Sequence, residues 1–96
     1  MSHTNKIIYT RPNAETGYYT PKDEYLNKIE EYFSSGKIIQ KPTKVEDGLT
    51  ITFTIVYKDT DSYLDFKEEP VVKNNHTARA AYCSGYSISY DLQSDV

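Results

Sequence analysis

The chain has 96 residues, a net charge of −3 from 11 basic and 14 acidic side chains, and one cysteine, Cys83. This length predicts one α+β domain over 1–96, with an ordered core over 6–91. The charge argues against a nucleic-acid partner, and a single cysteine excludes an internal disulfide. Without a signal sequence or a long apolar run, we expect a cytoplasmic protein with no membrane partner.

The predicted elements begin with a short strand over 6–10, where the side chains favour β-structure. A loop over 13–19 follows. A helix then starts with Thr20 as N-cap and Pro21 as its first residue, and Gly36 follows its last turn. Its apolar residues share one stripe of 3.6-residue period: Tyr25, Leu26, Ile29, Tyr32 and Phe33.

The middle of the chain predicts a β-hairpin. Residues 37–46 form an edge strand with a bulge, because Pro42 cannot donate a backbone hydrogen bond. The dipeptide at 47–48, Asp-Gly, is typical of a hairpin turn. The following strand, 49–58, has one apolar face and one face that carries mostly threonines.

Helical segments and a last strand complete the predicted fold. Polar N-cap candidates at 59–62 precede a short helix, and Pro70 begins a further helix that Gly85 ends. A one-sided strand over 86–92 follows. The order β-α-β-β-α-β predicts a ferredoxin-like fold, with an antiparallel sheet and the helices on one face.

The sequence contains few residues that indicate chemistry. It has no glycine-rich phosphate loop, and His3 and His76 do not have metal-ligand spacing. His76 and Cys83 are a weak candidate reactive pair, because two helical turns separate them by about 10 Å. Arg11 and Arg79 are interpreted as solvated arginines, and the alternative is that one of them pairs with an acid or an anionic ligand. We expect no catalytic residue, no metal and no cofactor.

Ten tyrosines and no tryptophan are the unusual feature of the composition. Tyrosine suits both half-buried positions and interfaces, so composition leaves both interpretations open. Tyr18 and Tyr19 in the first loop are candidate interface residues. The hydroxyl-bearing sheet face adds further candidates: Thr50, Thr52, Thr54, Ser87 and Ser89. We expect self-association as a dimer, or another protein partner.

The element order and chain length resemble the dimeric α/β-barrel families, such as the antibiotic-biosynthesis-type monooxygenases. The matching segments are SYLDF at 62–66, PV at 70–71 and ARAAY at 78–82. Together with IYTRP at 8–12, they also resemble small uncharacterised proteins of tailed phages of marine bacteria. The barrel resemblance implies two sheets packed face to face, around an apolar substrate or a haem whose only candidate ligand is His76.

Two hypotheses for function follow. The first is a non-enzymatic interaction or assembly protein, such as a phage accessory or virion component, and it ranks ahead because catalytic residues are missing. The alternative is a small cofactor-independent enzyme of the dimeric-barrel monooxygenase type. An enclosed apolar cavity between two sheets would favour the enzyme, and an exposed tyrosine patch would favour the assembly role.

Overall fold

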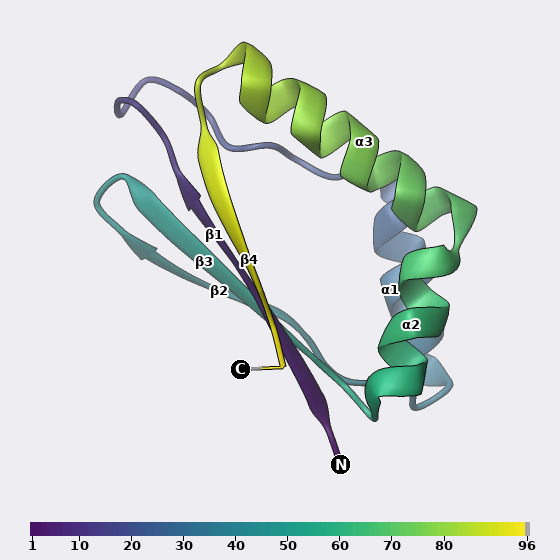
Figure 1. Cartoon of the computed structure of the whole chain (residues 1–96). Helices are drawn as coiled ribbons and strands as arrows, with labels where there is room; N and C mark the ends of the chain where they lie inside the picture. The colour runs from purple at the N-terminus through teal and green to yellow at the C-terminus, as the bar shows by residue number, and fades with distance from the viewer. Residues whose placement is uncertain (96) are drawn as a thin grey trace.

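The computed structural model describes residues 1–95 and contains one sheet covered on one face by helices (Figure 1). The strands are antiparallel and lie in the order β2-β3-β1-β4. This arrangement confirms the predicted ferredoxin-like α+β fold. The elements are β1 (His3–Thr10), α1 (Asp23–Ser34), β2 (Ile38–Asp47), β3 (Thr50–Tyr57), α2 (Thr60–Glu68), α3 (Pro70–Gly85) and β4 (Ser89–Ser94).

The pairing register separates the two faces of the sheet. Ile7 on β1 lies opposite Phe53 on β3 and Leu92 on β4, and these three side chains face the helices. Because side chains alternate along a strand, Ile8 and its partner Thr52 point the other way. The predicted division into an apolar face and a hydroxyl-rich face is therefore confirmed.

The β2–β3 hairpin follows the prediction closely. Gly48 adopts a φ of 61°, which the turn requires and which glycine accepts without strain. β2 is an edge strand whose register shifts between Ile38 and Gln40 and again between Gln40 and Thr43. Pro42 lies within the second shift, where its missing N–H does not interrupt the ladder.

α1 begins at Asp23, two residues later than predicted. Lys22 is the N-cap in an extended conformation, and its side chain makes no capping hydrogen bond. Thr20 and Pro21 lie outside the helix, whose first hydrogen bonds run from the N–H groups of Tyr25 and Leu26 to the Lys22 carbonyl. The end of the helix is as predicted, with Gly36 at a φ of 81°.

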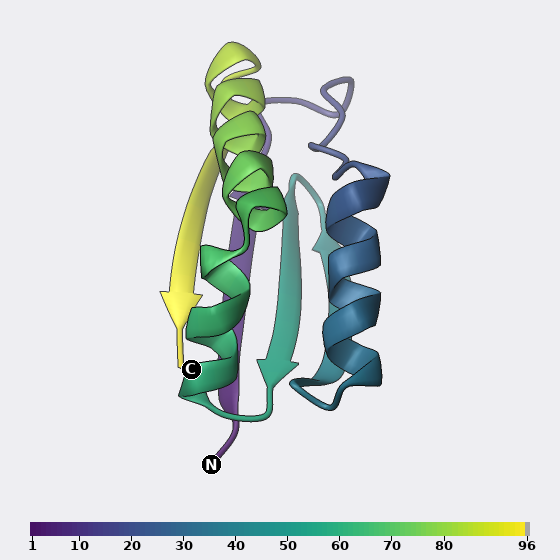
Figure 2. The same ribbon diagram turned by 90° about the vertical axis from the view of Figure 1, so that its right-hand side faces the viewer.

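α2 and α3 are separated by a single extended residue, Glu69. Asp59 caps α2 by accepting a hydrogen bond from the Ser62 N–H at 2.8 Å. In Figure 2, α1 lies over the β2 side of the sheet, and α2 and α3 lie over the β1 and β4 side. No helix in residues 1–95 has the length and apolarity that a membrane crossing needs.

The buried core is divided into two clusters. Tyr57 of β3 belongs to the larger cluster, and Ile51 of the same strand belongs to the smaller one. Phe53 and Ile55 lie between them and are only half-buried. The larger cluster contains Ile29, Tyr32, Ile38, Tyr57, Phe66 and Val72; the smaller contains Tyr9, Ile51, Cys83 and Ile88.

Candidate functional site

A cavity of about 850 Å³ lies between the sheet and the helices. Its floor includes Ile7, Phe53 and Ile55, the half-buried residues of the sheet centre. α1 and α3 contribute Tyr25 and Arg79 to its walls. From the sequence we expected an enzyme cavity between two sheets, but this one lies on the helix side of a single sheet, within one chain.

Tyrosines supply much of the cavity lining, including Tyr9, Tyr19, Tyr25 and Tyr57. Burial raises the pKa of Tyr9 to about 12, and it also raises the pKa of Tyr25 and Tyr57. These phenols therefore stay neutral at pH 7 and can only donate or accept hydrogen bonds. The Tyr19 hydroxyl donates to Oδ1 of buried Asn75 at 3.1 Å, which joins the first loop to α3.

His76 and Arg79 bring polar chemistry into this apolar space. They lie three residues apart on α3, so they share one side of the helix, and both line the cavity. Burial, and then the charge of Arg79, lower the pKa of His76. The imidazole is consequently neutral at pH 7.

Arg79 is not the solvated arginine that we expected. It is half-buried, and its Nε has no hydrogen-bond partner among residues 1–95. Its guanidinium carbon is 5.2 Å from the centroid of the Tyr90 ring. No carboxylate in this part of the chain forms an ion pair with it. A half-buried cation without an acid partner is suited to binding an anion.

Cys83 does not share the cavity with His76. Its side chain is 1% exposed and belongs to the smaller core cluster with Tyr9 and Ile51. Burial raises the pKa of the thiol, so the reactive thiolate is disfavoured. The structure thus places the two residues in different environments, one in the cavity and one in the core.

Tyr18 and Tyr19, the tyrosines of the first loop, have different surroundings. The Tyr18 hydroxyl donates to the Leu49 carbonyl at 2.7 Å, and the Arg11 guanidinium carbon is 5.0 Å from the centroid of its ring. Tyr18 therefore fastens the loop to the start of β3. Tyr19 lines the cavity instead.

The hydroxyl-bearing candidates occupy two locations. Thr50, Thr52 and Thr54 lie on the sheet face away from the helices, as does Ser89 of β4. Ser87 lies outside the sheet, in a turn with a φ of 58°. The last strand starts three residues later than predicted, because Ile88 is buried and its N–H donates to the Cys83 carbonyl at 2.9 Å.

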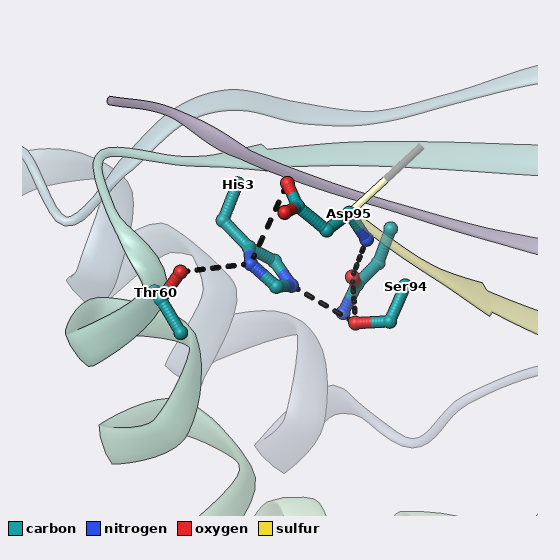
Figure 3. Close-up of polar contacts among 5 residues, drawn as sticks. His3, Thr60, Ser94 and Asp95 are labelled. Atoms are coloured by element: carbon teal, nitrogen blue, oxygen red, sulfur yellow. Dashed lines mark hydrogen bonds and ion pairs between the residues drawn. The ribbon is translucent and has the colours of Figure 1, made fainter.

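A polar cluster around His3 was missed by the sequence analysis, which started the first strand at residue 6. β1 begins at His3, whose side chain is buried at the end of the sheet. Its Nδ1 is 3.2 Å from Thr60 Oγ1, and its Nε2 is 3.0 Å from Ser94 Oγ (Figure 3). The alternation of His3 with Ile7 and Tyr9 was the available signal.

Comparison with known proteins gives similarity of structure only. No family model matches the chain, and no curated protein matches it. SnoaB from Streptomyces nogalater, a cofactor-independent oxygenase, superposes with a TM-score of 0.62 at 13% identity, covering 99% of this chain and 91% of SnoaB. A hydroxynitrile lyase from Passiflora edulis gives 0.55 at 11% identity, covering 96% of this chain and 92% of the lyase.

A third similar structure is a candidate antibiotic biosynthesis monooxygenase from Caulobacter crescentus. Its TM-score is 0.55 at 6% identity, and the match covers 98% of this chain and 89% of that protein. These neighbours contradict the first hypothesis, a non-enzymatic assembly protein, and favour the enzyme alternative. The chain is similar in fold to the antibiotic-biosynthesis monooxygenase-like proteins.

Proposed function

We propose that the protein is a small cofactor-independent oxygenase, and that its substrate is an apolar aromatic carbon acid bound in the cavity. The tyrosine-lined cavity on the helix side of the sheet carries this proposal. Its volume of about 850 Å³ falls within the ordinary range for small-molecule sites. SnoaB, which has a similar fold, is a cofactor-independent oxygenase.

The reaction class follows from the chemistry of dioxygen. Without a cofactor, ground-state dioxygen reacts readily only with an electron-rich carbanion, so the protein must remove a proton from carbon. The carbanion forms a C–O bond with dioxygen, and the resulting peroxide takes up the proton. Loss of water then leaves a ketone, so that one CH2 group and one O2 become one C=O group and one water.

Arg79 is the residue best placed to stabilise the carbanion. Arg79 lines the cavity and has no carboxylate partner among residues 1–95, where its Nε is buried and unpaired. A fixed cation beside the developing enolate oxygen stabilises the transition state more than the neutral substrate. The neutral phenols of Tyr9 and Tyr25 add polar contacts without competing charge.

The proposal is tested with anthrone, a tricyclic carbon acid whose oxidation gives anthraquinone. We expect the protein to accelerate oxygen consumption and anthraquinone formation above the rate in buffer. Arg79→Met should reduce this acceleration by about ten- to a hundredfold, because one stabilising charge is lost. Lys73→Met is the matched control, since Lys73 lies on the same helix but is exposed and pairs with Glu68 at 2.7 Å.

Two results would contradict the proposal. One is a rate equal to that in buffer for protein that binds anthrone. The other is equal loss of activity in the Arg79 and Lys73 variants. The resemblance to phage proteins and the cytoplasmic location stay predictions from the sequence.

A further inference from the structure

A polar cluster lies where β1, α2 and the end of β4 meet, and in it His3 is buried whereas Thr60, Ser94 and Asp95 are exposed (Figure 3). His3 is 5% exposed and lies at its centre. Thr60 and Ser94 contact opposite nitrogens of the imidazole, at 3.2 Å and 3.0 Å. Ser94 also lines the cavity, so this hydroxyl connects the buried ring to the space where a substrate would bind.

The surroundings of His3 favour one tautomer of its imidazole ring. Asp95 Oδ1 is 3.9 Å from Nδ1 of His3 on the side of Thr60, and its charge favours a proton on that nitrogen. The lone pair of Nε2 then faces the Ser94 hydroxyl. In the structure the single hydroxyl proton of Ser94 is donated to Asn5 Oδ1 at 2.8 Å, and Asn5 Oδ1 also accepts the Asp95 N–H at 3.3 Å. Asn5 therefore keeps a donor when the Ser94 hydroxyl turns towards His3.

We propose that Ser94 and His3 form the relay that removes the proton from the substrate, an inference that rests on the proposed oxygenase function. Ser94 Oγ takes the proton from the substrate carbon while its own proton moves to Nε2 of His3. The electron pair of the broken C–H bond stays on the substrate as the carbanion. The imidazolium is held by Thr60 and Asp95 until the peroxide recovers the proton.

The arrangement is similar to that of other active sites, in which a third group orients the base. Two aromatic rings pack against His3, and charges of both signs lie near it. Tyr63 of α2 stacks on His3 with 4.6 Å between ring centroids and 10° between planes, and Tyr57 of β3 approaches edge-on at 6.2 Å. The neighbouring charges are Asp95, the N-cap Asp59, and Lys67, whose Nζ is 5.6 Å from the centroid of the Tyr63 ring.

His76 is the competing base, since it also lines the cavity. Its pKa is lowered by burial and by Arg79, which makes it a weaker proton acceptor. No acid among residues 1–95 forms an ion pair with it. His3 has both an oriented hydroxyl on the cavity side and a carboxylate behind it, so the geometry favours His3.

The test separates proton removal from oxygenation by excluding oxygen. Anthrone is mixed with the protein anaerobically, and the formation of its coloured anion is followed by stopped-flow absorbance. We expect Ser94→Ala and His3→Gln to slow this step by about a hundredfold. Ser94→Thr should restore it, because the hydroxyl returns. Ser89→Ala, an exposed serine on the same strand that faces away from the helices, is the control.

Binding is measured in parallel by quenching of tyrosine fluorescence, and folding by circular dichroism. If the Ser94→Ala variant ionises anthrone as fast as the unmodified protein, or if His76→Gln alone abolishes ionisation, the relay is overturned and the oxygenase proposal stands. If the unmodified protein neither binds nor ionises anthrone, both proposals fail. Nitrogen-15 spectra of the unmodified protein must also show the His3 proton on Nδ1; a proton on Nε2 alone contradicts the relay.

Discussion

Two effects of different size lower the pKa of His76. Burial is the larger cause of its lowered pKa, and the charge of Arg79 is the smaller. We therefore expect an NMR titration to give a pKa below the ordinary value of 6.5, and Arg79→Met to raise it only partway. A variant that titrates at the ordinary value would show that the charge, and not burial, dominates.

The same shift predicts how stability depends on pH. Below pH 6.5 the unfolded chain protonates His76 before the folded chain does, so the free energy of unfolding falls as the pH decreases through the folded pKa. The His76→Gln variant should lose less stability between pH 7 and pH 5 than the unmodified protein. Urea unfolding at both values measures the difference, and identical losses would contradict the assignment.

At the scale of elements, β3 offers a direct test of the two sheet faces. Ile51 is 3% exposed and lies in the smaller core cluster, whereas its neighbour Thr52 points away from the helices. Ile51→Asp should unfold the domain, because it buries an unpaired charge. Ile51→Ala should cost about 2–5 kcal/mol. Thr52→Asp should retain the fold.

Circular dichroism during urea unfolding distinguishes these variants. Greater damage from Thr52→Asp than from Ile51→Ala would show that the hydroxyl-rich face is buried in the stable protein. The comparison needs no substrate, so it tests the fold independently of the proposed activity.

The elements that the sequence predicts well are those defined by local patterns. The alternation along β3, the turn at Gly48 and the start of α3 at Pro70 depend on neighbours in the chain, and the structure confirms all three. The predicted start of α1 was wrong: Thr20 and Pro21 match a capping pattern, but the helical hydrogen bonds begin at the Lys22 carbonyl, and no neighbour in the sequence marks that residue.

The candidate site was harder to predict because distant segments build it. His3 and Ser94 are 91 positions apart, and only the pairing of β1 with β4 brings them together. Arg79 has no distinctive neighbours in the sequence, and its burial depends on how α3 lies over the sheet. The cavity itself depends on the distance between helices and sheet, which no residue pattern encodes.

For the whole molecule, the face of the sheet away from the helices is open in the single chain. This face carries the apolar side chains of Ile8, Val45 and Val56 beside its threonine and serine side chains, and Val45 is 69% exposed. We propose that two copies associate through this face. Light scattering over a dilution series should give the mass of a dimer, and Ile8→Lys should shift it to a monomer that stays folded.

Leu64→Lys, at an exposed position on α2, is the matched control and should remain dimeric. A monomer at every concentration of the unmodified protein would rule out this association. In that case the face would stay in water, while the cavity on the other side of the sheet would be unaffected.

The irregular β2 strand has a consequence for aggregation. The exposed edge of a regular strand can template pairing with strands of other molecules, which is a route to fibrils. In β2, Pro42 lacks the N–H that such pairing requires, and the register shifts around Gln40 interrupt the row of donors and acceptors. This edge of the sheet is therefore protected against the addition of strands from other molecules, even though Ile39 and Val45 are exposed along it.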